Sequence, residues 1–196
     1  MSDSGAESGG ILDSIVDFLF STVLMVVIVL VIRGFIFQPY IVEGKSMEPT
    51  LSSGEYIIVD KISYRLASPK RGDVVVLNPD SKMPDLSYIK RVIGLPGERV
   101  IIENGVVKIV SNNKEEVLQE PYLGTNNKTY TTTFQDRLVV TLRDNEYFVL
   151  GDNRANSLDS RSIGAINREH IIGKARFILL PVAKAGAIEG VPYFKN

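Results

Sequence analysis

The chain has no cysteine, a single histidine and almost no net charge. The absence of cysteine excludes disulfides, thiolate metal sites and cysteine nucleophiles together. Because His170 is the only imidazole, a multi-histidine metal site is excluded as well. Lysine and arginine total 22 and aspartate and glutamate total 23, so the net charge is −1. This balance lacks the basic footprint of a nucleic-acid-binding protein, and we expect no nucleic-acid partner.

The N-terminal part contains a long apolar run. No charged residue lies between Phe18 and Ile32, and the run resumes after Arg33, which can reach the membrane interface. The run is long enough to cross about 30 Å of hydrocarbon. We predict a transmembrane anchor over residues 15–37, preceded by a disordered acidic tail at 1–14. A cleaved signal peptide would need a basic start and a small-residue cleavage site, and a buried helix is the other alternative.

The charges around this segment bear on its orientation. No lysine or arginine precedes it, whereas four follow within a short distance: Arg33, Lys45, Lys61 and Arg65. Taken alone, the positive-inside rule therefore places the rest of the chain inside the cell.

The remainder, residues 38–196, is predicted to be one mostly β domain, because short apolar or alternating runs are separated by turn residues. The dipeptide Asn104-Gly105 predicts a two-residue hairpin. A single short helix is predicted at 167–172, with Asn167 as its N-cap. The polar segment 111–137 is predicted to be a surface excursion or a small subdomain. The strands are predicted at Tyr40–Val42, Tyr56–Val59, Val74–Leu77, Tyr88–Ile93, Arg99–Ile102, Val106–Val110, Leu138–Leu142, Tyr147–Leu150 and Ala175–Leu180.

Ser46 is a candidate nucleophile, although a serine in a turn is a weak signal by itself. Gly44 permits a tight turn before it and Pro49 stiffens the exit. The Ser46 N–H could then face an oxyanion. A serine hydroxyl needs a base to take its proton. His170 is one candidate, but it lies in the predicted short helix, where a surface or packing role is the simpler interpretation.

Lys90 is the better candidate base. Burial among the apolar residues of its strand would lower its pKa and make the neutral amine accessible. In a strand, Tyr88, Lys90 and Val92 share one face, while Arg91 projects from the other. The alternative is an ordinary edge-strand lysine that discourages aggregation. The loop at 151–161 is either a solvated turn or a rigid scaffold, since its side chains can bond their own backbone.

Together these features resemble bacterial type I signal peptidase, the membrane-bound Ser/Lys endopeptidase that removes signal peptides. The segments that carry the resemblance occur in the family's order: 46–51, 54–61, 71–76, 88–98 and 151–161. The resemblance covers neither the acidic tail nor segment 111–137. It implies a mostly β catalytic domain to which the substrate adds as an extended strand.

The resemblance also implies roles for individual residues. Ser46 would be the nucleophile and Lys90 the general base, and the Ser157 hydroxyl would orient the lysine amine. Four residues match the family's charged support: Asp152, Arg91, Asp159 and Arg161. Five residues match its pockets for small substrate side chains, which would give cleavage after Ala-x-Ala: Val42, Met47, Leu51, Tyr88 and Ile89. This chemistry implies no metal or organic cofactor.

One position departs from part of the family. Some members have a serine two residues before the nucleophile that helps to bind the oxyanion, and here that residue is Gly44. The Ser46 N–H and a second, unidentified donor would then serve. The expected partners are signal peptides of exported preproteins, the lipid bilayer and nearby secretion machinery, and a monomer is expected. Signal peptides are cut on the far side of the membrane, so the resemblance places the domain outside the cytoplasm, against the lysine and arginine count.

Two other readings remain. A self-cleaving Ser/Lys repressor-type protease shares the β core, but it should carry a DNA-binding helical domain rather than an anchor. An inactive, membrane-tethered β scaffold could bind peptides. The intact set of Ser46, Lys90 and Ser157 argues against that scaffold.

Overall fold

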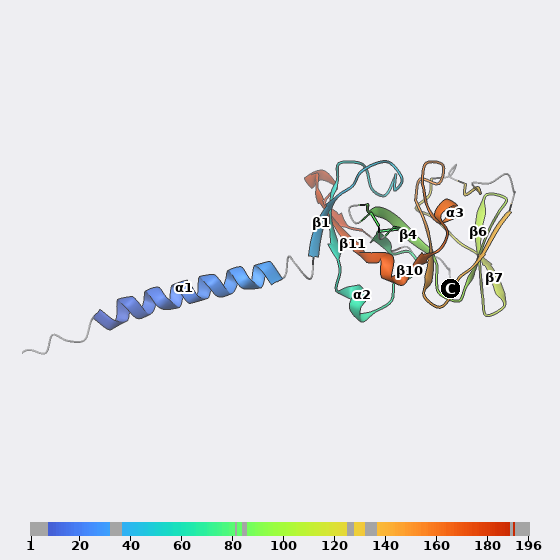
Figure 1. Ribbon diagram of the computed structural model, residues 1–196. Coiled ribbons are helices and arrows are strands. Elements are labelled where there is room, and N and C mark those ends of the chain that lie inside the picture. Colours follow the sequence, from blue (N-terminus) through green and yellow to red (C-terminus); the bar gives the residue numbers. More distant parts are fainter. Residues whose placement is uncertain are drawn as a thin grey trace, which may run out of the picture.

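The computed structural model describes residues 8–31, 37–80, 82–83, 86–124, 128–131, 137–188 and 190. One long helix, α1 (Ser8–Val31), projects away from a β domain built of two sheets (Figure 1). Its apolar stretch Asp13–Leu30 is long enough to cross a membrane, and none of that stretch is buried.

The ends of α1 differ from the prediction. The helix begins at Ser8, so the last part of the predicted disordered tail, residues 8–14, is helical. The predicted anchor reached residue 37, but Phe37 is the first residue of a strand. Pro39 explains this, because proline disfavours helical backbone in the residue before it and lacks the N–H that a helix interior needs.

The larger sheet is eight-stranded and places the edge strand β1 beside β2. All the pairings between its strands are antiparallel. Its order is β1 (Phe37–Ile41), β2 (Tyr56–Asp60), β11 (Ile171–Leu180), β3 (Val74–Leu77), β4 (Tyr88–Gly94), β9 (Glu146–Leu150) and β10 (Ile166–Asn167), and β12 (Gly186–Ala187) pairs with β11.

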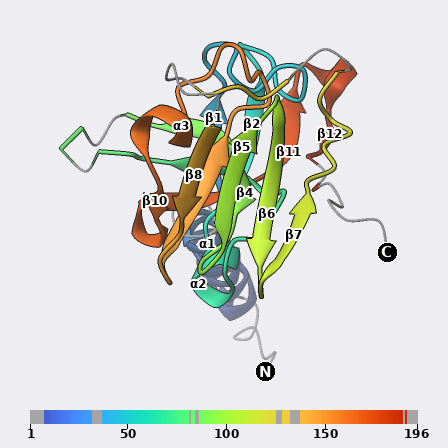
Figure 2. The same ribbon diagram turned by 90° about the vertical axis from the view of Figure 1, so that its right-hand side faces the viewer.

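The smaller, four-stranded sheet packs beside it (Figure 2). Its order is β7 (Lys114–Val117), β6 (Val106–Ser111), β5 (Arg99–Glu103) and β8 (Arg137–Thr141). Asn104 and Gly105 both have positive φ, 53° and 81°, and join β5 to β6 as the predicted hairpin. A buried cluster that includes Ile93, Val100 and Phe148 joins the two sheets.

Every predicted strand is present, but the predicted helix at 167–172 is wrong. Only a single 3₁₀ turn, η2 (Arg168–His170), forms there, and the Asn167 side chain makes no capping bond. The chain continues as β11 from Ile171, because alternate residues of 171–175 are buried as in a strand. Three short helical turns of the described residues were not predicted: α2 (Ser63–Leu66), α3 (Ser160–Ile163) and η3 (Val182–Lys184).

Segment 111–137 is only partly a surface excursion. Residues Lys114–Val117 add β7 to the edge of the smaller sheet, and Leu118 is buried in the core between the sheets. Later residues of the segment lie against the loop at 151–161, as described below.

Strand β4 presents different side chains on its two faces. Tyr88 and Val92 belong to the apolar cluster on one face, and Ile89 packs on the other face with Val42 and Met47. Lys90 therefore lies on the same face as Tyr88 and Val92, as the alternation of side chains along a strand predicted.

Candidate active site

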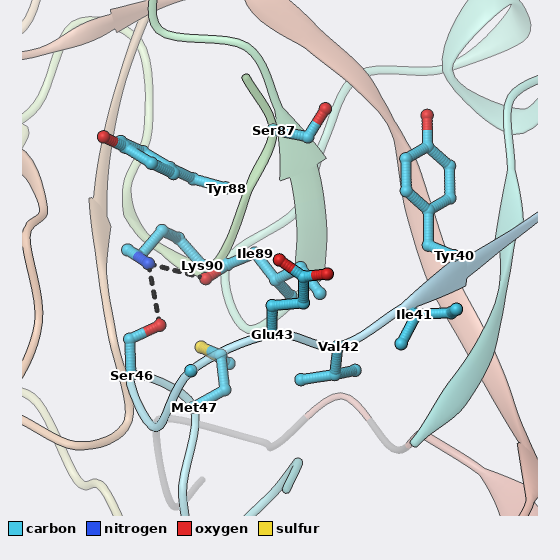
Figure 3. Close-up of a pocket in the computed structure, with 11 residues that line it drawn as sticks. Tyr40, Ile41, Val42, Glu43, Ser46, Met47, Ser87, Tyr88, Ile89 and Lys90 are labelled. Atoms are coloured by element: carbon cyan, nitrogen blue, oxygen red, sulfur yellow. Dashed lines mark hydrogen bonds between the residues drawn. The ribbon is translucent and has the colours of Figure 1, made fainter. Parts of the chain in front are cut away.

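Ser46 and Lys90, 44 positions apart in the sequence, meet at one end of an open groove (Figure 3). The Lys90 Nζ lies 2.9 Å from Ser46 Oγ, and it donates a second hydrogen bond of 2.9 Å to the carbonyl oxygen of Ile89. Ser46 stands in the turn after β1, where Gly44 has a φ of 84°, a conformation that favours glycine. The turn thus directs the serine hydroxyl at the amine.

The environment of Lys90 favours its neutral form. The residue is only 3% exposed, and burial lowers its pKa to about 8, although the charges of Asp159 and Asp152 act in the opposite direction. The Tyr88 ring lies beside the amine, with its centroid 5.2 Å from Nζ. With a pKa of about 8, roughly a tenth of the lysine is neutral at pH 7.

Arg91 projects from the opposite face of β4 into a buried ion pair. Its Nε and one terminal nitrogen contact the two carboxylate oxygens of Asp152 at 2.8 and 2.6 Å. Thr50, four residues after Ser46, donates to the same carboxylate at 2.5 Å. This pair therefore joins β4, the serine turn and the loop after β9.

The loop at 151–161 is held by hydrogen bonds from its own side chains, in keeping with the scaffold alternative. Asn153 holds the serine turn, because its N–H donates to the Ser46 carbonyl oxygen at 3.0 Å and its side chain donates to the Lys45 carbonyl at 3.1 Å. Asp159 accepts the N–H of Gly151 at 3.1 Å and caps α3. Burial raises the pKa of Asp159, but its bonds with Arg161 and with the Gly151 N–H outweigh this and hold that pKa below its usual value.

Ser157 lies beside the pair without bonding to it. Its Oγ is buried and makes no hydrogen bond of acceptable geometry within the part of the chain that the structure describes, although it lies close enough to the Asp159 carboxylate to help lower the pKa of that group. A Cβ added at Gly151 would collide with both Ser157 Oγ and the Ser46 carbonyl oxygen. Gly151 is thus required for close approach, and it brings the Ser157 hydroxyl next to the serine turn.

The groove has a volume of about 270 Å³. Four of the predicted pocket residues line it: Val42, Met47, Tyr88 and Ile89. Leu51, also predicted there, does not line it, because its side chain is fully buried in the core with Val42 and Met47.

Besides Gly44, four residues that line the groove were not predicted: Tyr40, Ile41, Glu43 and Ser87. Tyr40 could have been found, because it shares a strand face with Val42. Its phenol is partly buried, which raises its pKa.

The Ser46 N–H has no acceptor among the described residues and remains available at the end of the groove. His170 lies elsewhere: its Nε2 is 3.7 Å from Glu169 in η2, and it does not line the groove. The surface role expected for this histidine agrees with that position.

Comparison with known proteins places the chain in a family. The family model described as signal peptidase, peptidase S26, matches residues 15–180. The chain is 41% identical over 174 residues to signal peptidase I S of Bacillus subtilis (strain 168), covering 86% of this chain and 90% of the relative. It is 40% identical over 174 residues to a signal peptidase I of Bacillus amyloliquefaciens, covering 86% and 89%.

A solved signal peptidase I of Enterococcus faecalis V583 is 31% identical, with a TM-score of 0.43 over 55% of this chain and 97% of the other. The family match spans most of the chain, from within α1 to the end of β11, and it includes both Ser46 and Lys90. The chain therefore belongs to peptidase family S26, the signal peptidases.

Proposed function

We propose that the protein is a membrane-anchored serine endopeptidase that cuts N-terminal signal peptides from exported preproteins after small residues. In this proposal Ser46 is the nucleophile and Lys90 the general base. The observation that carries it is the 2.9 Å separation of Ser46 Oγ and a buried Lys90 Nζ at the end of a groove.

The reaction would begin with Lys90 neutral. As Ser46 Oγ attacks the scissile carbonyl carbon, its proton moves to Lys90 Nζ, and the carbonyl oxygen becomes an oxyanion near the Ser46 N–H. The resulting ammonium then returns that proton to the leaving amine as the C–N bond breaks. A water molecule, deprotonated by Lys90, would then attack the acyl carbon, and Lys90 would return that proton to Ser46 Oγ as the ester C–O bond breaks and the signal peptide leaves as its carboxylate.

The surrounding residues would support the proton transfers. Neutral Lys90 has two N–H groups, of which Ile89 O accepts one. In this proposal the buried Ser157 hydroxyl accepts the other, which would aim the nitrogen lone pair at Ser46. Asp152 and Asp159, held by Arg91 and Arg161, favour the ammonium that forms midway, since their charges raise the pKa of Lys90.

The groove supports substrate binding by strand addition. Strand β1 is an edge strand, and its open side leads directly into the residues that line the groove. An extended substrate there would point alternate side chains at Val42, Met47 and Ile89. In this proposal the groove floor accepts small side chains at the first and third positions before the cut.

We further propose that α1 crosses the cytoplasmic membrane once and that the β domain faces outward, as a monomer beside the secretion machinery. A domain on the inner face would not meet cleavage sites that emerge outside. Long domains can be translocated despite basic residues near their anchor, so the lysine and arginine count does not exclude this orientation.

Sealed membrane vesicles test function and orientation together. We expect right-side-out vesicles that carry the protein to convert an added preprotein to its mature form without detergent, whereas inverted vesicles require detergent. Vesicles carrying Ser46→Ala give the background, and N-terminal sequencing locates the cut. Cleavage by intact inverted vesicles would reverse the orientation. No cleavage above background, even in detergent, would favour the peptide-binding scaffold.

The pH dependence of turnover follows from the lowered pKa of Lys90. The protonated amine cannot accept the serine proton, so kcat should rise tenfold per pH unit below about 8 and level off above it. The measurement is kcat at saturating preprotein between pH 5.5 and 10. His170→Ala should have the same profile. A limb at lower pH that disappears in His170→Ala would assign the base to histidine instead.

A further inference from the structure

Three arginines contact the same piece of chain, on the side away from the groove: Arg91, Arg154 and Arg161. They come from segments 88–98 and 151–161, which carry the family resemblance. That piece comes from segment 111–137, which the sequence resemblance did not cover. We call its contacting residues Glu120, Tyr122, Thr129 and Tyr130 the arginine clamp. Its two ends are tied to the smaller sheet, where the N–H of Leu118 donates to Val107 O at 2.8 Å and the N–H of Thr129 donates to Gly105 O at 3.0 Å.

Arg154 is the centre of these contacts. It is 2% exposed, and every one of its N–H groups has an acceptor. Glu120 receives a bidentate pair from it, with one bond of 2.9 Å, and the Tyr122 hydroxyl accepts another bond at 3.0 Å. The Tyr122 hydroxyl itself donates to Glu120 at 2.6 Å. Burial lowers the pKa of Arg154, but Glu120 more than offsets this, so the guanidinium stays charged.

The clamp also contacts the other two arginines, Arg91 and Arg161. The guanidinium of Arg91 lies over the Tyr122 ring, 4.2 Å from its centroid. Arg161 donates to the Tyr130 carbonyl at 3.1 Å. Each arginine therefore contacts the clamp on one side and, on its other side, bonds to a residue of the loop at 151–161.

A short chain of contacts leads from the clamp to Ser46. The fifth N–H of Arg154, on Nε, donates to the Gly151 carbonyl at 3.0 Å. Gly151 is packed against the Ser46 carbonyl and Ser157 Oγ, and Asn153 bonds the Ser46 carbonyl directly. Fixing Arg154 therefore fixes the backbone against which the serine turn rests.

We propose that Glu120 and Tyr122 are positioning residues for catalysis: through Arg154 and Arg91 they hold segment 151–153 and so the alignment of Ser46 with Lys90. This rests on the proposed function of the Ser46–Lys90 pair. Neither residue touches the groove, so the clamp should act on turnover rather than on substrate binding. Small misplacements of a reacting group cost large factors in rate, up to about a hundredfold for 1 Å.

The test compares kcat and KM of purified full-length variants in detergent, well below their melting temperatures. Glu120→Gln keeps the shape but removes the charge that pairs with Arg154, and we expect kcat to fall by about tenfold or more with KM within twofold. Tyr122→Leu, which removes the ring from Arg91, should behave likewise. Tyr122→Phe keeps that ring and should restore most of the lost kcat. Glu115→Gln, on the exposed strand β7, is the matched control and should equal wild type.

Thermal melts and a Ser46→Ala sample complete the design. If Glu120→Gln fails to fold, the Tyr122→Phe and Tyr122→Leu pair still decides the question. A lowered melting temperature with kcat within twofold of wild type in Glu120→Gln and Tyr122→Leu would mean a purely structural clamp and overturn the proposal. So would a kcat within twofold of wild type in both Tyr122→Phe and Tyr122→Leu. Full activity in Ser46→Ala would contradict Ser46 as the nucleophile and so the proposed function. An inactive Ser46→Ala together with a Glu120→Gln of normal activity would contradict only the role of the arginine clamp.

Discussion

Replacing Lys90 with methionine is expected to lower preprotein cleavage by more than about 10⁴-fold, as is replacing Ser46 with alanine. Methionine has a similar length and suits the buried, apolar surroundings of Lys90, so the fold should persist while the base is lost. The double variant should be no worse than either single one, because groups that act as one unit are strongly non-additive. The measurement is kcat/KM on a purified preprotein.

A surface lysine gives the control for this experiment. Lys114 has a side chain that is 76% exposed, and Lys114→Met should cleave at the wild-type rate. A Lys90→Met enzyme that kept more than a tenth of wild-type turnover would show that another group takes the serine proton. Losses that multiplied in the double variant would show that the two residues do not act together.

Phenylalanine placed one or three residues before the cut should reduce kcat/KM by more than about a hundredfold relative to alanine. The side chains at these positions would enter the part of the groove floored by Val42, Met47 and Ile89, which is close-packed beneath. Inserting a bulky ring into a packed site forces strain, whereas the loss of one methylene costs only about 1–3 kcal/mol. The measurement uses preproteins that differ at single positions.

Phenylalanine two residues before the cut is the matched control, because that side chain would point out of the groove and should change cleavage only a few-fold. Ile89→Ala, which widens the groove, should recover part of the cleavage of one bulky substrate. Equal cleavage of all the alanine and phenylalanine substrates would contradict the assignment of this groove as the pocket for small residues.

The fold was predictable wherever apolar residues alternate or cluster. Val74–Leu77 and Tyr88–Gly94 are such strands, and both matched the prediction closely. Strand β7 was not predicted, because Lys114, Glu115 and Glu116 lie on an exposed edge and carry no apolar signal. The helix predicted at 167–172 failed because a polar run followed by isoleucines fits a turn and a strand equally well.

The site was predictable only in part. The motifs identified Ser46 and Lys90 as the pair that now lies at hydrogen-bond distance. Leu51 shows the limit of such reasoning, since an apolar residue near a pocket can line it or be buried beneath it. The arginine clamp had no local signal at all, because Glu120 and Arg154 are 34 positions apart and meet only through the packing of the two sheets.

Pro39 in β1 has a consequence for where a substrate can be cut. Proline fits an edge strand only where its missing N–H would face the open side, and β1 is the edge next to the groove. Under the proposed strand addition, an incoming chain finds main-chain donors beyond Pro39, along the residues that lead to Ser46, but not at Pro39 itself. A substrate that slipped by two residues towards α1 would keep its side chains facing correctly yet lose a hydrogen bond there. The proline thus favours a single register and helps to define which peptide bond reaches the serine.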